Sequence, residues 1–277
     1  MVVPFAGDAA GAAAAVAAVR RLDLAEGDEI LLVDNTAAGL LPESADGPIS
    51  VIRAPDKQSA YFARNAGAER ARGDWLLFLD ADCLAPPTLI GDYFGTPPRD
   101  DAGVLAGELI GDDSQNALSA RWSRSRRGLR TAQERSRGPA PAGVTGNMLV
   151  RRAAWDEVGG FPGDVRSDAD VELCWRIQRE GWRLEYRPDA LVIHRDPERI
   201  LAIWSQAVGY GAGRRWTEQL HPGSGQQPPL VQPMVRMVGG VAWWLVTLRF
   251  ERAAFKVLDG IAAVGLWWGY QRVSNSV

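Results

Sequence analysis

The chain of 277 residues is poor in cysteine and lysine, and each shortage excludes a class of site. Its two cysteines, Cys83 and Cys174, cannot build a disulfide framework or a four-cysteine zinc site. The only lysines are Lys57 and Lys256, so we expect no catalytic lysine. The net charge of −3 argues against general nucleic-acid binding, which needs a basic surface.

Signals for secretion or for spanning a membrane are also missing. Residues 1–5 enter an apolar stretch without a charged segment or a cleavage site, which predicts a chain that starts in the cytosol. The apolar stretches Met237–Leu248 and Gly260–Tyr270 are both shorter than the ~20 residues of a membrane-spanning helix. Their paired tryptophans suit two amphipathic helices in a membrane interface. Helices packed on the main domain or on a twin subunit are an equal alternative.

What the sequence does contain is an alternation of short apolar runs with helical patterns. The runs predict strands at 2–5, 29–33, 49–53, 75–79 and 144–150, and the patterns predict helices at 9–21, 60–72 and 200–216. This spacing predicts an α/β fold, a mixed and mostly parallel central sheet with flanking helices. A polar segment, 221–232, separates this part from a C-terminal helical appendage.

The sharpest motif follows the apolar run 76–79, where Asp80 and Asp82 stand one residue apart. Residues two apart on an extended chain point the same way, so both carboxylates can address one site. Ligands of parallel sheets bind at this end of the strands. Hard oxygen ligands suit Mg²⁺ or Mn²⁺ holding a diphosphate. Acidic residues also end strands simply as turn formers.

A second acidic cluster, with carboxylates at Asp168, Asp170 and Glu172, opens a helical pattern. Ser167 and Asp170 could form a capping box, which would explain the serine without a function. A carboxylate in the first turn of a helix is kept ionised by the helix dipole, which suits a general base. His194 ends the next apolar run and is either a surface residue or a metal ligand.

Four blocks, in this order, resemble the family 2 glycosyltransferases. They are residues 33–36; 64–67 with 73–82; 146–152 with 159–161; and 170–176 with His194. The resemblance covers about residues 1–196 and implies a GT-A catalytic domain. Nucleotide-sugar binding would occupy about 1–110, the acceptor side about 111–196, and residues 197–277 would form the helical appendage.

The resemblance also implies roles for individual residues. Asp34 would bind the nucleotide base, Arg64 would approach the nucleotide, and Gly146 with Asn147 would lie where sugar and acceptor meet. Further donor contacts would come from Pro4, Phe5, Asp8, Asp80 and Ala81. Asp80, Asp82 and His194 would hold Mn²⁺ or Mg²⁺. Asp170 would be the base that deprotonates the acceptor hydroxyl for an inverting displacement.

The chain departs from the family pattern in two places. Ala169 stands where the family usually has Glu, and Glu172 where it usually has a second Asp, so Asp168 could act as a substitute partner of the base. The segment 5–8 replaces the common Tyr-Asn pair, so Asp8 could replace a contact to the nucleotide base.

These observations predict a metal-dependent hexosyltransferase-like enzyme that takes its sugar from a UDP, dTDP or GDP donor. The acceptor would be a saccharide or lipid-linked glycan of the cell envelope, at the inner face of the membrane. Peripheral contact would run through 233–277, and a homodimer is compatible with the sequence. The arginine-rich stretch 121–137 is either a solvated segment or an anion-binding flap. The alternatives are an inactive nucleotide-sugar-binding scaffold and a sugar-phosphate nucleotidyltransferase.

Overall fold

A computed structural model describes residues 1–42, 47–126, 138–165 and 167–273. The chain divides into two compact units. The sheet unit comprises residues 1–110, 129–165 and 169–195, and the helical unit comprises 111–128, 166–168 and 196–277. Part of the arginine-rich stretch, residues 127–137, lies outside the described residues.

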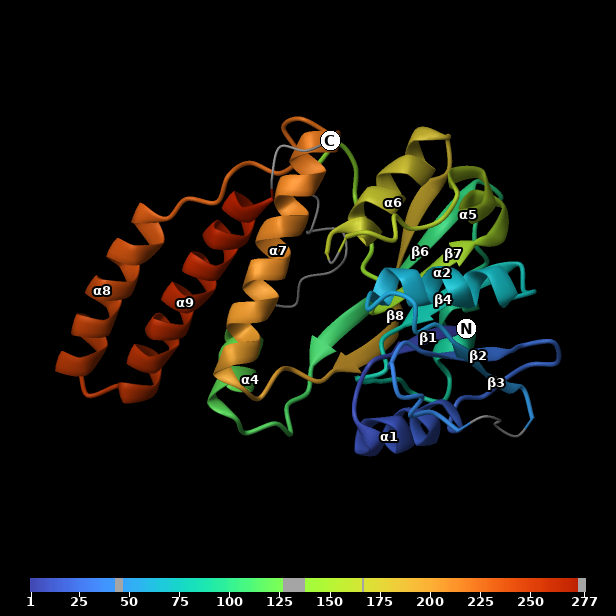
Figure 1. Ribbon diagram of the computed structural model, residues 1–277, viewed down its shortest axis with the longest axis horizontal. Helices are drawn as coiled ribbons and strands as arrows, with labels where there is room; N and C mark the ends of the chain where they lie inside the picture. Colours follow the sequence, from blue (N-terminus) through green and yellow to red (C-terminus); the bar gives the residue numbers. More distant parts are fainter. Residues whose placement is uncertain (43–46, 127–137, 166, 274–277) are drawn as a thin grey trace. The chain divides into compact units, whose positions relative to one another are not determined.

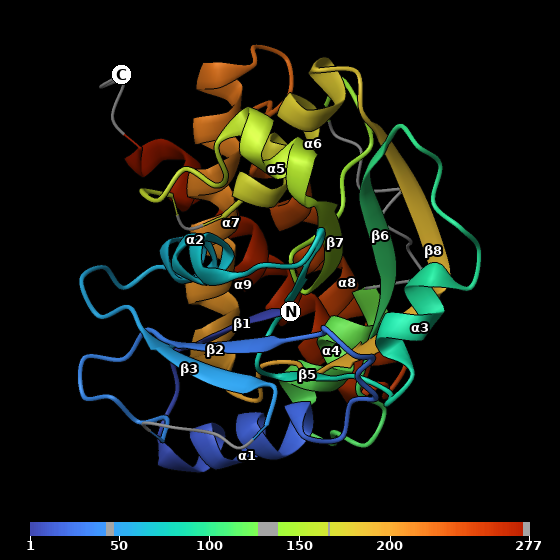
Figure 2. The same ribbon diagram turned by 90° about the vertical axis from the view of Figure 1, so that its right-hand side faces the viewer.

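An eight-stranded sheet forms the centre of the sheet unit (Figures 1 and 2), in the order β3-β2-β1-β4-β7-β6-β8-β5. Strands β3, β2, β1 and β4 are parallel, β7 runs antiparallel to both β4 and β6, and β5 runs antiparallel to β8. The strands are β1 (Val2–Phe5), β2 (Ile30–Asp34), β3 (Ile49–Arg53), β4 (Trp75–Leu79), β5 (Cys83–Leu84), β6 (Ala102–Gly111), β7 (Asn147–Arg151) and β8 (Arg183–His194).

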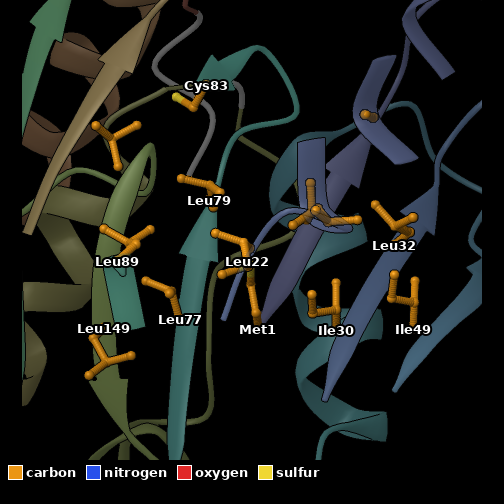
Figure 3. Packing of buried hydrophobic residues seen from close by; sticks show 14 of the residues in the cluster. Met1, Leu22, Ile30, Leu32, Ile49, Leu77, Leu79, Cys83, Leu89 and Leu149 are labelled. Atoms are coloured by element: carbon orange, nitrogen blue, oxygen red, sulfur yellow. The ribbon is translucent and has the colours of Figure 1, made fainter. Parts of the chain in front are cut away.

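Helices cover both faces of this sheet because successive side chains of a strand point to opposite faces. In β4, Leu77 and Leu79 join the core with α1 (Ala9–Val19) and α3 (Leu89–Phe94), part of which Figure 3 shows. The alternate residues Leu76 and Phe78 join a second core. That core includes α2 (Ala60–Arg70), α5 (Arg152–Val158) and α6 (Ala169–Arg179). The predicted mixed, mostly parallel sheet with flanking helices is confirmed.

The helical unit contains α4 (Leu118–Arg126), α7 (Ile200–Leu220), α8 (Val231–Val246) and α9 (Phe250–Arg272). Glycines bring α7 and α9 together: a Cβ on Gly211 would meet the carbonyl oxygen of Leu266, and one on Gly269 would meet that of Val208. The C-terminal helices expected from the sequence are therefore present. In the part of the chain that the structure describes, no helix has the length and apolar character needed to cross a membrane.

Candidate active site

The aspartate pair lies in the turn between β4 and the short strand β5. The backbone N–H of Cys83 donates to the carbonyl of Asp80 at 3.0 Å, which closes the turn. Strand β5 then pairs with β8 so that Cys83 stands opposite His194. This pairing places the imidazole Nε2 of His194 3.8 Å from Oδ1 of Asp82. Two residues far apart in the sequence thereby reach one end of the sheet.

Asp82, Cys83 and His194 form a cluster whose ligand atoms all lie within 4.8 Å of one another. The side chain of Asp82 is 59% exposed, and its distance from His194 is too long for a hydrogen bond. Nδ1 of His194 is buried, and none of the described residues is its hydrogen-bond partner. A carboxylate oxygen and an imidazole nitrogen are donors that Mn²⁺ accepts, so these residues fit the expected cation.

Asp80 is held by an ion pair with the guanidinium of Arg64, which projects from α2 and is 5% exposed. Its second carboxylate oxygen, Oδ2, lies beside Gly146, where a side chain's Cβ would come within 3.3 Å of it. The carbonyl of Gly146 also accepts from the Cys83 thiol, with 3.6 Å between the sulfur and oxygen atoms. The structure thus brings Arg64, Asp80, Asp82, Gly146 and His194 together.

The two carboxylates of this turn affect each other electrostatically. Partial loss of solvent raises the pKa of Asp82; the charge of His194 opposes this rise, and the neighbouring Asp80 carboxylate adds to it. A bound cation would favour the ionised form instead, because an opposite charge close to a carboxylate lowers its pKa.

Asp170 lies in the first turn of α6, as predicted, and its carboxylate is bonded from two other segments. The hydroxyl of Tyr61 donates to Oδ1 at 3.2 Å, and the backbone N–H of Thr145 donates to Oδ2 at 3.1 Å. The N–H of Val171 donates to Oδ1 at 3.0 Å. No sequence motif predicts the contact of Tyr61 with Asp170, because 109 positions separate the two residues.

Asp168 precedes α6 and belongs to the helical unit. Its φ is 65°, in the left-handed region that few side chains other than Asn and Asp adopt. The hydroxyl of Ser167 donates to its carboxylate at 3.4 Å. The helix begins at Ala169, after the left-handed Asp168. A capping box led by Ser167 would instead start the helix at 168.

Near the N-terminus, Asp34 and Asp8, which are predicted to contact the nucleotide sugar, form hydrogen bonds within the protein. The Asp34 carboxylate is fully buried and accepts from Thr36 N–H and hydroxyl, from Leu41 N–H and, at 3.4 Å, from Arg53. Burial favours its protonated form, yet these hydrogen bonds and the Arg53 charge lower the pKa of Asp34. Asp8 caps α1 by accepting from the N–H of Gly11 at 2.9 Å.

Phe5 and Asn147 also direct their side chains inward, whereas Pro4 and Ala81 remain partly accessible. The Phe5 ring belongs to the hydrophobic core. The fully buried Asn147 amide accepts from the Tyr93 hydroxyl at 2.7 Å and donates to the carbonyls of Glu108 and Ala190. Any contact of Phe5 or Asn147 with the nucleotide-sugar donor would therefore involve the backbone of that residue and not its side chain.

Comparison with known proteins adds a family and a fold. A model described as Glycosyl transferase family 2 matches residues 1–159. The pre-mycofactocin glycosyltransferase of Mycobacterium tuberculosis is 25% identical over 256 residues, which cover 89% of this chain and 52% of that relative. The poly-beta-1,6-N-acetyl-D-glucosamine synthase of Staphylococcus aureus is 24% identical over 200 residues, covering 68% and 48%. The chain spans about half the length of these relatives.

Two solved structures share the fold at low sequence identity. One is mannosyltransferase PcManGT from Pyrobaculum calidifontis in complex with GDP-Man and Mn²⁺, with a TM-score of 0.63 and 16% identity over 96% of this chain and 86% of that one. The other is S. aureus TarS 1-349, with a TM-score of 0.53 and 12% identity over 98% and 88%. These likenesses confirm the predicted GT-A fold.

Proposed function

The chain belongs to glycosyl transferase family 2, and from this premise we propose a specific reaction. The protein transfers a sugar from a nucleotide-diphosphate sugar to a hydroxyl of a glycan or lipid-linked acceptor, by a metal-assisted inverting displacement. The observation that carries the proposal is the approach of His194, at the end of β8, to Asp82, which lies with Asp80 in the turn after β4.

The donor end of the site is formed by the turn after β4. Asp82 and His194, with Asp80 beside them, would hold Mn²⁺ or Mg²⁺, which when bound neutralises charge on the departing nucleoside diphosphate. The guanidinium of Arg64 forms an ion pair with Asp80 and supplies a fixed positive charge beside the turn. The complex of PcManGT with GDP-Man and Mn²⁺ supports this arrangement by analogy of fold.

At the acceptor end, Asp170 is the proposed general base. It would remove the proton of the acceptor hydroxyl as that oxygen attacks the anomeric carbon from the face opposite the leaving diphosphate. One displacement of this kind inverts the anomeric configuration. Support comes from its place in the first turn of α6 and from the hydrogen bonds that Tyr61 and Thr145 donate to its two carboxylate oxygens. Asp168 is the second carboxylate that we assign to this end.

Recognition of the nucleotide is assigned to the N-terminal side of the sheet. We propose that Asp34 and Asp8 lie near the base, and that Pro4, Phe5 and Ala81 line the donor, with Gly146 and Asn147 near the sugar. Contact between Asp34 and the base requires exchange of one of its present bonds, of which the 3.4 Å bond from Arg53 is the longest.

Hydrolysis of candidate donors tests the reaction directly. The purified protein would be incubated with UDP-glucose, UDP-N-acetylglucosamine, GDP-mannose and dTDP-glucose, with Mn²⁺ or with a chelator. We expect release of the nucleoside diphosphate from one donor, lost with the chelator, and a matching thermal stabilisation by that donor. Stabilisation without turnover would instead support an inactive binding protein. Release of pyrophosphate from a nucleoside triphosphate and a sugar phosphate would support a nucleotidyltransferase.

A second part of the proposal places the helical unit on the inner face of a membrane. Helix α8 has no buried residue and exposes an apolar stripe at helical spacing, with Val231, Val235, Val238 and Val246 all more than 60% exposed. The loop that follows adds Leu248, and Trp243 is 62% exposed. An amphipathic helix with this composition binds at the level of the lipid headgroups.

Charge placed on the stripe tests the membrane contact. Val246→Glu should reduce cosedimentation with phosphatidylglycerol vesicles, whereas Leu201→Glu should not. These two residues are matched at 81% exposure, and Leu201 lies on α7. Equal binding by the wild type and Val246→Glu would contradict the contact, and self-association abolished by Val246→Glu would assign the stripe to a second copy of the chain.

A further inference from the structure

We infer that Tyr61 is a positioning residue for the proposed base Asp170, which it orients through its phenolic hydroxyl. The inference rests on the proposed function and concerns a residue outside all the motifs of the sequence. Tyr61 projects from α2 and is 6% exposed, and its hydroxyl donates to Oδ1 of Asp170 at 3.2 Å.

The Asp170 carboxylate is held by donors on both of its oxygens. Oδ2 accepts from the backbone N–H of Thr145 at 3.1 Å and from the hydroxyl of the same residue at 3.5 Å, and Oδ1 accepts from the backbone N–H of Val171, the next residue of α6. The shorter bonds, at 3.0 and 3.1 Å, come from backbone donors, whose positions are set by the chain. The Tyr61 hydroxyl is a side-chain donor from a different element, so it fixes the rotation of the carboxylate relative to α2.

Helix α2 also anchors the other end of the site. Arg64 lies one turn after Tyr61, pairs with Asp80, and stacks its guanidinium 5.1 Å from the centre of the Tyr61 ring. One helix therefore holds both the carboxylate beside the proposed cation and the proposed base. This arrangement sets the spacing that a single displacement needs, because reacting groups must be aligned to within fractions of an ångström.

The packing of Tyr61 separates its ring from its hydroxyl. The ring lies 5.1 Å from that of Phe161, at an interplanar angle of 44°, within the second core. Phenylalanine would keep both this contact and the stacking of Arg64. Tyr61→Phe therefore removes one hydrogen bond and leaves the apolar packing in place.

Steady-state kinetics of Tyr61→Phe test the inference, with whichever donor of the panel above the wild type hydrolyses fastest. We expect kcat to fall roughly tenfold to a hundredfold, the scale of a hydrogen bond to a charged group, while the donor KM changes less than about twofold. The matched control is Tyr270→Phe. Like Tyr61→Phe, this substitution removes the hydroxyl of a buried tyrosine. The Tyr270 hydroxyl accepts a hydrogen bond from Arg215 at 3.5 Å and lies in the helical unit, so kcat of Tyr270→Phe should equal that of the wild type.

A double-mutant cycle distinguishes positioning from a general structural role. In an Asp170→Asn background, Tyr61→Phe should have no further effect on kcat, because the group that it orients has lost its function. Additive losses in the double variant, or an unchanged kcat in Tyr61→Phe, would overturn the inference. Turnover of no donor by the wild type would contradict the proposed function itself, which separates the two failures. Thermal unfolding of each variant checks that it is folded.

Discussion

Two aspartates lie at the ends of strands of the same sheet, and they differ in burial and in hydrogen bonding. Asp34 is the last residue of β2 and is fully buried, whereas Asp82 follows β4 with its side chain 59% exposed. The chain supplies Asp34 with four hydrogen-bond donors, and its pKa is lowered. The pKa of Asp82 is raised by partial burial, an effect to which the neighbouring Asp80 adds.

A carboxylate at the end of a strand is directly available to a ligand where the chain leaves its oxygens unfilled, whereas one that the chain already bonds must first exchange a bond. In sequence both residues follow an apolar run, and both are therefore candidates for binding. In the structure Asp34 organises the loop that begins at Thr36, while Asp82 and His194 face each other beyond hydrogen-bond distance. We expect substitutions to affect stability at the first site and catalysis at the second.

The largest effect is expected at Asp82. Asp82→Ala should lower metal-dependent donor hydrolysis at least about a hundredfold, because the departing diphosphate loses the charge stabilisation of the cation. Its thermal unfolding temperature without metal should equal or exceed that of the wild type, since a like-charge contact with Asp80 is removed. Retained turnover in Asp82→Ala would show that Asp82 does not bind a cation that the reaction needs.

His194 should have the next largest effect. His194→Gln removes the imidazole that faces Asp82 and should weaken Mn²⁺ binding by roughly tenfold, with the loss recovered at higher Mn²⁺ concentration. Calorimetric titration of Mn²⁺ measures this change. His221→Gln, the substitution of the only other histidine, is the matched control in the helical unit and should leave Mn²⁺ affinity unchanged.

Asp34→Asn should act on stability, with an expected loss of about 1–2 kcal/mol in the free energy of unfolding at neutral pH. Because the folded pKa of Asp34 is lowered, the ionised form stabilises the fold above about pH 4, and this contribution is lost as pH falls through the folded pKa. The difference from the wild type should shrink below about pH 4. Urea unfolding at several pH values measures it, and a difference that grows in acid would contradict the account.

The smallest effect is expected at Arg53, the partly exposed partner of Asp34. Arg53→Gln removes an ion pair with a 3.4 Å separation whose guanidinium side chain is 44% exposed, so it should cost less than about 1 kcal/mol. A loss as large as that of Asp34→Asn would show that the charge of Arg53, and not the hydrogen bonds of Thr36 and Leu41, holds Asp34.

Much of the sheet could be predicted because its first strands are short segments rich in apolar residues. The predicted ranges 2–5, 49–53 and 75–79 match β1, β3 and β4. Strands β5 and β6 have no such signal: β5 has two residues and exists through its pairing with β8. In β6, Gly103 and Gly107 are required because Trp182 and Asn147 occupy the space of a side chain.

The sequence identifies residues that lie at the candidate site, but it does not show which partner each side chain bonds. Asp82 and His194 lie close together because β5 and β8 pair, whereas Asp80, in the same turn, forms an ion pair with Arg64. Asn147 illustrates the limit, because its amide holds the carbonyls of Glu108 and Ala190 in the interior. Nothing in the sequence distinguishes that role from sugar binding. The bond from Tyr61 to Asp170 depends on the docking of two helices and leaves no local pattern.

Binding of Mn²⁺ to three proteins, measured side by side by calorimetry, shows whether Asp82 and not Asp34 holds the cation. The wild type, Asp82→Asn and Asp34→Asn would be titrated at neutral pH after circular dichroism has confirmed that each is folded. We expect the wild type and Asp34→Asn to bind Mn²⁺ with similar affinity and Asp82→Asn not to bind it. Binding by Asp82→Asn at the affinity of the wild type, or loss of binding in folded Asp34→Asn, would show that Asp82 is not the ligand of the cation or that Asp34 is needed for its binding.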